Sequence, residues 1–124
     1  MATTGKSLLV VEDDEPAREA LANLLRLEGY AVAAAGNGAE ALDYLRTNPP
    51  PDLILLDMLL PVLDGWHFLT EVRHVSDVRH VPIIVITSTI LTPDWARDHG
   101  CAGFLRKPIK PDELLAEVGR CVGA

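Results

Sequence analysis

Residues Pro50 to Gly65 read PPDLILLDMLLPVLDG, and this stretch decides how the rest of the chain is interpreted. The run 53–56 is apolar, follows two prolines and is too short for a buried helix, so it predicts a strand buried on both faces. Asp57 comes directly after it. Because burying an unpaired carboxylate is costly, Asp57 either leaves the sheet at the surface or has a partner inside it.

The composition limits the classes of protein to which this chain can belong. Its 124 residues suit one domain with a substantial core, and we expect a single domain over 1–124 with no second domain. The formal net charge is −7 and the basic residues are scattered, which argues against direct binding of nucleic acid. Cys101 and Cys121 lack a metal-binding spacing, and we interpret them as reduced packing residues. Without a signal segment or a membrane-length apolar run, we expect a cytoplasmic protein that does not bind membranes.

Strand-like runs alternate with helix-like segments along the whole chain. Asp14 or Glu15 is expected to cap the first helix, and Thr92 the fourth. The repeated strand–helix order and the buried character of the strands predict an α/β fold with a parallel sheet covered by helices on both sides. The strands are expected at about 7–11, 30–35, 53–56, 83–86 and 101–106, and the helices at about 16–27, 39–46, 65–75, from 93 and from 111.

Polar side chains stand at the ends of four of these strands. Glu12 and Asp13 follow the first, Asp57 the third, Thr87 the fourth and Lys107 the fifth. Since the carboxyl ends of parallel strands share one edge of the sheet, we expect these side chains to converge although they are far apart in sequence.

Three carboxylates in one pocket repel one another unless a cation neutralises them. A set of oxygen ligands without histidine or cysteine suits Mg²⁺ or Mn²⁺ rather than zinc. Mg²⁺ leaves an oxygen of Asp57 free to act as a nucleophile that forms an acyl phosphate. Lys107 would then offset the charge of the phosphoryl group, and the Thr87 hydroxyl could donate to one of its oxygens.

Each of these residues also has an ordinary structural interpretation. The acidic run 12–14 equally suits the cap of a helix, Thr87 alone is a common strand-end hydroxyl, and Lys107 before Pro108 is typical of a surface turn. Their joint occurrence at successive strand ends is what favours a functional site.

The motifs VVEDDE, ILLDMLLPVLDG, IIVITS and the KP of FLRKPIKP resemble those of one family. From about Ser7 to Val122 the chain is similar to the receiver domain of two-component response regulators. The resemblance implies a flavodoxin-like (βα)5 fold, a doubly wound five-stranded parallel sheet of strand order 2-1-3-4-5. It also implies that no separate output domain lies within 1–124.

The resemblance assigns roles to individual residues. Asp57 is expected to be the phospho-acceptor and a ligand of Mg²⁺. Asp13 is expected to hold the metal directly and Glu12 through water, with the backbone carbonyl of Leu59 as a further ligand. Asp14 is expected to be a cap.

The switch residues follow from the same resemblance. Thr87 matches the switch hydroxyl and Lys107 the phosphate-pairing lysine. Phe104 matches the switch aromatic, with a plain core aromatic as an equal alternative. Pro61 and Gly65 match the turn after the third strand.

The function implied is that of a phosphorylation-controlled switch, which catalyses only its own phosphorylation and dephosphorylation. The expected phosphoryl donor is a phosphohistidine on a sensor kinase or a histidine phosphotransfer protein. The expected output is a protein contact or a phosphorylation-dependent dimer through the fourth helix, fifth strand and fifth helix. The interval from Thr87 to Lys107 is shorter than the family pattern, which leaves the mode of output open.

Two other classes of protein share part of this pattern. An Mg²⁺-dependent phosphohydrolase working through an aspartyl phosphate would need a second aspartate as general acid, where this chain has Leu59. A small flavin-binding protein of the same topology would need a phosphate-binding loop after the first strand, where residues 12–14 are acidic and repel phosphate.

Overall fold

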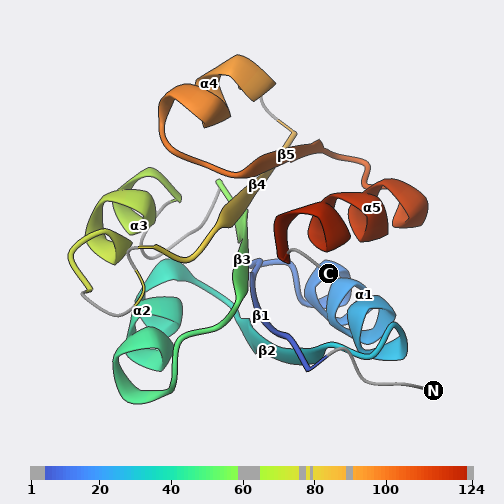
Figure 1. The fold of residues 1–124 in the computed structure, drawn as a ribbon, viewed down its shortest axis with the longest axis horizontal. Helices are drawn as coiled ribbons and strands as arrows, with labels where there is room; N and C mark the ends of the chain where they lie inside the picture. The colour runs from blue at the N-terminus through green and yellow to red at the C-terminus, as the bar shows by residue number, and fades with distance from the viewer. Residues whose placement is uncertain (1–4, 59–64, 76–77, 79, 89–90, 123–124) are drawn as a thin grey trace.

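The computed structural model describes residues 5–58, 65–75, 78, 80–88 and 91–122. Strands and helices alternate along these residues, as predicted (Figure 1). None of their helices has both the length and the apolar character needed to cross a membrane. The strands are β1 (Ser7–Val11), β2 (Ala31–Ala35), β3 (Leu53–Asp57), β4 (Ile83–Thr87) and β5 (Gly103–Arg106), and the helices are α1 (Glu15–Leu27), α2 (Gly38–Thr47), α3 (Gly65–Val72), α4 (Pro93–Asp98) and α5 (Pro111–Val122).

The strands form one parallel sheet of order β2-β1-β3-β4-β5, which confirms the flavodoxin-like topology. Chain order runs one way from β1 to β2 and the other way from β1 through β3 to β5. The reversal therefore falls between β1 and β3, at the centre of the sheet. In open sheets of this type, ligands bind outside the carboxyl ends of the strands at such a point.

Helices cover both faces of the sheet, α1 and α5 on one side and α2, α3 and α4 on the other (Figure 1). The central strand β3 shows why its sequence is a continuous apolar run. Leu53 and Leu55 pack under α1 and α5, Ile54 and Leu56 pack under the other helices, and all four side chains are fully buried. Truncating one of them to alanine would cost about 2–5 kcal/mol.

Side-chain caps fix where two of the helices begin. The Asp14 carboxylate accepts a hydrogen bond of 2.9 Å from the Ala17 N–H at the start of α1, so Asp14 and not Glu15 is the cap. The Thr92 hydroxyl accepts one of 3.1 Å from the Trp95 N–H at the start of α4. Each cap satisfies a backbone donor that the helix itself leaves without a partner.

Strands β2 and β5 begin later than the sequence predicts, after Tyr30 and Cys101 respectively. The Tyr30 N–H donates to the Leu25 carbonyl at 3.2 Å, and the Cys101 N–H donates to the Ala96 carbonyl at 2.9 Å. Both residues therefore close the preceding helix and are not yet part of a strand. The two cysteine thiols are free and partly buried, in agreement with their interpretation as packing residues.

Helix α3 ends at Val72, earlier than the predicted Val75. The N–H groups of His74 and Val75 donate to the carbonyls three residues earlier, those of Glu71 and Val72. The chain after Val72 therefore forms turns with hydrogen bonds between residues three apart. The spacing of apolar residues does not distinguish such turns from a continuing helix.

Leu59 and Pro61, to which the sequence assigned roles, lie outside the described residues. Gly65 lies just within them and begins α3. Its N–H donates to the Met58 carbonyl at 3.2 Å, and a Cβ atom at position 65 would lie 2.5 Å from Met58 Cα. Only glycine fits this close approach, which is a steric reason for the glycine in the predicted turn.

Candidate functional site

The predicted site residues come together at the carboxyl edge of the sheet. Glu12 and Lys107 directly follow β1 and β5, while Asp57 and Thr87 are the last residues of β3 and β4. The sequence placed Asp57 and Thr87 just beyond their strands, whereas both belong to the ladder. Strand pairing therefore fixes their backbones. The residues Glu12, Asp57 and Thr87 expose only 1%, 3% and 0% of their surface.

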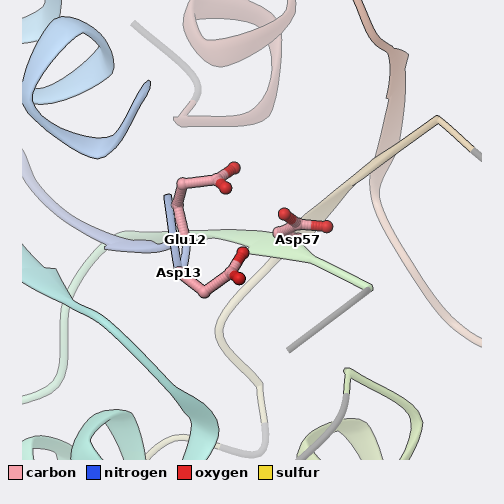
Figure 2. Close-up of side chains that lie close together, drawn as sticks. All are labelled: Glu12, Asp13 and Asp57. Carbon is pink, nitrogen blue, oxygen red and sulfur yellow. The ribbon is translucent and has the colours of Figure 1, made fainter. Parts of the chain in front are cut away.

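Three carboxyl groups surround one small space between the ends of β1 and β3 (Figure 2). One oxygen each from Glu12, Asp13 and Asp57 lies within 4.8 Å of the others. Asp13 is exposed, whereas the other two are buried. Negative charges held this close to one another, two of them buried, favour a bound cation.

Lys107 provides the positive charge of the cluster. Its Nζ atom lies 3.0 Å from Asp57 Oδ2 and 3.0 Å from Glu12 Oε2. Its backbone N–H donates to the Thr87 carbonyl at 2.9 Å. The side chain of Lys107 thus contacts two acids while its backbone is tied to the end of β4.

The pKa values of Glu12 and Lys107 reflect these surroundings. Burial, and then the nearby Asp57, raise the pKa of Glu12 to about 7, although Lys107 and the Asp14 N–H act in the opposite direction. Burial works to lower the pKa of Lys107, but hydrogen bonds and charges from Glu12 and Asp57 outweigh it and raise that pKa. The lysine is therefore cationic at neutral pH, while the metal-free Glu12 binds a proton part of the time.

The donor set fits a hard divalent cation such as Mg²⁺ or Mn²⁺. All of the candidate ligands are carboxylate oxygens, and the described part of the chain has no histidine or cysteine among them. The Oε2 atom of Glu12 is buried, and the Lys107 ammonium lies 3.0 Å from it. Asp13, Asp57 and Glu12 are the residues that would hold the ion.

Phe104 lies away from the acidic cluster, on β5. Its ring is partly buried against the core under α4, and the guanidinium carbon of Arg106 lies 5.1 Å from the ring centroid. Its backbone N–H donates to Glu117 Oε2 at 3.2 Å. Phe104 therefore contacts the core and also borders the surface between α4 and α5, and its role as a switch residue stays a prediction.

Arg18 on α1 borders the site and is not among the residues predicted from the sequence. Its Nη1 atom donates to the Glu12 carbonyl at 3.0 Å and to the Asp13 carbonyl at 3.5 Å. These bonds reach backbone oxygens rather than carboxylates, so charge spacing alone does not reveal them. The only signal in the sequence is a basic residue in the helix that directly follows the acidic run.

Comparison with known proteins identifies the family. The response regulator receiver domain matches residues 8–119. The polar-differentiation response regulator DivK of Brucella anthropi is 32% identical over 120 residues, which cover 95% of this chain and 97% of DivK. The receiver domain of a sensor histidine kinase from Pseudomonas aeruginosa PAO1, solved with a magnesium ion in its active-site cleft, is 33% identical with a TM-score of 0.86 and covers 98% of this chain and 100% of that one.

Other relatives are longer. Response regulator Rre1 of Synechocystis is 36% identical over 115 residues, which cover 90% of this chain and 49% of Rre1. This chain thus spans about half the length of several curated relatives that it matches. The expectation that residues 1–124 act without a separate output domain therefore stays a prediction. The match over residues 8–119, the strand order and the acidic cluster together show that the chain belongs to the response regulator receiver domain family of two-component systems.

Proposed function

We propose that Asp57 accepts a phosphoryl group from a phosphohistidine of a sensor kinase or a phosphotransfer protein. The observation that carries this proposal is the position of Lys107 Nζ, 3.0 Å from Asp57 Oδ2 at the edge of the acidic cluster. One edge of the sheet thus holds the proposed nucleophile Asp57 and the proposed metal ligands Glu12 and Asp13. Lys107 adds a positive charge there for the incoming phosphoryl group. Receiver domains are regulatory rather than classical enzymes, and phosphorylation of Asp57 is the regulatory event.

In the transfer step an Asp57 carboxylate oxygen attacks phosphorus and forms an acyl phosphate. The phosphorus–nitrogen bond breaks, and its electron pair returns to the imidazole nitrogen of the donor histidine. A bound Mg²⁺ would neutralise the carboxylates and the phosphoryl oxygens. Lys107 stays cationic throughout and pairs with a phosphoryl oxygen, and the Thr87 hydroxyl donates to another.

Lys107 and Thr87 also give the signal a route out of the site. Lys107 pairs with Asp57 and Glu12 in the present structure, and these contacts change when Asp57 carries a phosphoryl group. Its backbone is bonded to the Thr87 carbonyl, and Phe104 precedes it on β5. The added charge therefore biases the arrangement of β4, β5 and the surface beside Phe104.

The surface around α4, β5 and α5 is the proposed output face. A hollow of about 340 Å³ lies there, and Phe104 and Gly103 of β5 line it together with side chains of both helices. Arg97, Arg120 and Glu117 add charged side chains to its lining. This mixture of an aromatic ring and charged groups suits a protein partner or a second copy of the domain.

The phosphoryl donor has its own proposed docking groove between α1 and the start of α5. One hollow of about 280 Å³ has Glu12 and Lys107 in its lining together with Ala17, Ala20 and Ile109. A second hollow continues along α1 past Ala20 and Ile109. An apolar groove that begins at the acidic site suits an amphipathic helix that carries the donor histidine.

The phosphohydrolase alternative makes a different prediction. It requires many rounds of hydrolysis of an organic phosphate, whereas the receiver proposal requires one phosphoryl group per chain. Release of inorganic phosphate from a panel of organic monophosphates, measured against protein concentration, separates the two.

The proposal is tested by incubating the protein with acetyl phosphate, which transfers its phosphoryl group to the carboxylate and releases acetate. Intact mass spectrometry should detect the gain of one phosphoryl group in the presence of Mg²⁺. The gain should disappear when the metal is chelated and in Asp57→Ala. Asp52→Ala is the matched control, because Asp52 lies at the opposite end of β3 and its carboxylate accepts from the Ser7 N–H at 2.8 Å. Labelling that survives in Asp57→Ala would overturn the proposal.

A further inference from the structure

Arg18 lies where α1 faces the loop that carries two of the metal-site acids. Its guanidinium donates from one nitrogen, Nη1, to the carbonyls of Glu12 at 3.0 Å and Asp13 at 3.5 Å. On the other side of this loop the Glu12 N–H donates to the Ala35 carbonyl of β2 at 3.1 Å. The backbone of Glu12 is thus held at both its donor and its acceptor, and Arg18 provides the second of these restraints.

Gly36 leaves room for this guanidinium. A Cβ atom at position 36 would lie 3.2 Å from Arg18 Nη1, whereas the Glu40 carboxylate would be 3.8 Å away, at an ordinary contact distance. The guanidinium therefore fills the space between the ends of β1 and β2. It contacts the acidic loop through the backbone carbonyls of Glu12 and Asp13, and not through their carboxylates.

We infer that Arg18 is a positioning residue for the divalent-cation site, and this inference rests on the proposed function. Mg²⁺ accepts little departure from octahedral geometry and short ligand distances. Asp13 lies outside the sheet and its side chain is exposed, so the ladder does not fix the direction of its carboxylate. Arg18 holds the carbonyls of the residues that carry two of the three carboxyl groups, and through them it sets where those groups point.

A charge effect alone predicts the opposite result. If Arg18 acted only as a nearby positive charge, its removal would make the site more negative and would strengthen cation binding. Loss of a positioning contact weakens binding instead, typically by about 10-fold or more for groups that orient metal ligands. The sign of the change in Mg²⁺ affinity therefore separates the two roles.

Arg26 provides a matched control on the same helix. Its Nη2 atom donates to the Val32 carbonyl of β2 at 3.0 Å, so it also links α1 to a strand backbone through a guanidinium. It lies towards the other end of α1, far along the helix from Glu12. Arg18→Ala and Arg26→Ala change the net charge equally, and each removes a bond between a side chain and a backbone carbonyl.

The experiment is a calorimetric titration of metal-free wild type, Arg18→Ala and Arg26→Ala with Mg²⁺, together with urea unfolding of each protein. We expect the dissociation constant for Mg²⁺ to rise about 10-fold in Arg18→Ala and to stay within about twofold of wild type in Arg26→Ala. Both variants should lose similar stability. An Arg18→Ala protein that binds Mg²⁺ as tightly as Arg26→Ala, or more tightly than wild type, would overturn the inference.

Gly36→Ala tests the same contact without removing any charge. The glycine has no left-handed backbone conformation, so alanine fits its backbone, and the atom that must move is the end of a flexible side chain. We expect a several-fold weaker Mg²⁺ affinity with almost unchanged stability, and unchanged affinity would count against the inference. This variant decides the matter if Arg18→Ala does not fold. If wild type does not bind Mg²⁺, the proposed function is contradicted. If wild type and all variants bind Mg²⁺ equally well, only the inference about Arg18 is contradicted.

Discussion

At the scale of single residues, Glu12 determines how the site responds to pH. Its carboxyl group is buried, and burial together with the neighbouring Asp57 raises its pKa to about 7. The metal-free protein near neutral pH therefore contains a mixture of protonated and ionised Glu12. A divalent cation at the proposed site would bind the ionised form, so metal binding should be coupled to release of a proton.

This coupling predicts that the affinity for Mg²⁺ rises with pH. A group with a pKa of about 7 goes from roughly one-tenth ionised at pH 6 to nine-tenths at pH 8, so the apparent affinity should rise about 10-fold and then level off. Calorimetric titrations at pH 6, 7 and 8 measure this change. In Glu12→Gln the rise should be lost, and a wild-type affinity that does not change over this range would contradict the role given to Glu12.

The stability of the metal-free protein should follow the opposite trend. The folded state binds the Glu12 proton more tightly than the unfolded chain, whose pKa is near 4.5. The resulting contribution to stability is complete below pH 4.5 and is lost as the pH rises through about 7. With a chelator present, wild type should therefore become less stable relative to Glu12→Gln between pH 5 and pH 8, as measured by urea unfolding at each pH.

At the scale of secondary-structure elements, the junction between α5 and β5 depends on a small residue. Glu117 of α5 accepts from the Phe104 N–H at 3.2 Å, and Arg120 donates to the Ala102 carbonyl at 2.8 Å. These bonds satisfy backbone groups on the outer edge of the last strand in the sheet. Gly103 lies between them, where a Cβ atom would be 2.7 Å from Glu117 Oε2.

Two glycine substitutions should therefore have opposite effects on stability. Gly103→Ala places a methyl group 2.7 Å from Glu117 Oε2 and 3.1 Å from Ile84 Cγ1, so it displaces the carboxylate that bonds the Phe104 N–H and should destabilise the protein by about 1–3 kcal/mol. Gly119→Ala lies within α5, where a Cβ atom would meet nothing within 4 Å, and should stabilise the protein by about 0.5–1 kcal/mol. Urea unfolding of both variants measures the difference. Equal effects of the two substitutions would mean that the α5–β5 contact is not as close as described.

The groove beside α1 makes a second prediction at this scale. Ala20 lines both hollows of the groove, and a longer charged side chain there would block a docking helix. Ala20→Glu should slow phosphoryl transfer from a phosphorylated histidine phosphotransfer protein by about 10-fold or more, the loss expected of a disrupted docking contact. Phosphorylation by acetyl phosphate should stay at the wild-type rate, because this small donor needs no groove. Equal slowing with both donors would mean that the substitution disturbs Asp57 rather than docking.

The sequence predicted the elements that consist of continuous patterns. The apolar runs of β1, β3 and β4 and the caps at Asp14 and Thr92 appear where they were expected. The starts of β2 and β5 were predicted too early, because Tyr30 and Cys101 use their N–H groups to close the preceding helices. The mark of these helix ends in the sequence is Gly29 or Gly100 directly before each residue, because a glycine with positive φ allows the chain to close a helix in this way.

The site was predictable for a related reason. Parallel strands bring their carboxyl ends to one edge, so the approach of Lys107 to Asp57 follows from topology although the two are 50 positions apart. Arg18 and Glu117 were not predictable in the same way, because their partners are backbone atoms whose direction depends on the finished fold. Side chains that meet at strand ends, such as Lys107 and Asp57, can therefore be predicted from the sequence. Side chains that bond to the backbone near those ends, such as Arg18 and Glu117, cannot.

At the scale of the whole molecule, the proposed function requires a signal to pass from the acidic cluster to the face around α4, β5 and α5. Lys107 contacts Asp57 with its side chain and Thr87 with its backbone. Phe104 lies three residues earlier in the chain, on β5. Hydrogen exchange of backbone amides reports on this face directly. The Phe104 N–H is bonded to Glu117, so a rearrangement of β5 would change its protection.

Phosphorylation should therefore alter hydrogen exchange over 91–106 in wild type. Lys107→Ala should still accept a phosphoryl group from acetyl phosphate, but exchange in this segment should change much less, because the link between the phosphoryl group and β5 is missing. Lys110→Ala is the control, since Lys110 is exposed and its ammonium lies 4.0 Å from Glu113 rather than in the site. A full exchange response in phosphorylated Lys107→Ala would show that the signal takes another route.

The central claim is that Asp57 itself carries the phosphoryl group. Borohydride reduces an acyl phosphate to an alcohol, so a phosphorylated aspartate becomes homoserine, and peptide mass spectrometry locates it. After treatment with acetyl phosphate and Mg²⁺ we expect homoserine at position 57 alone, and none when the metal is chelated. Homoserine at Asp13 or Asp14, or no conversion in a protein whose intact mass shows phosphorylation, would contradict the account.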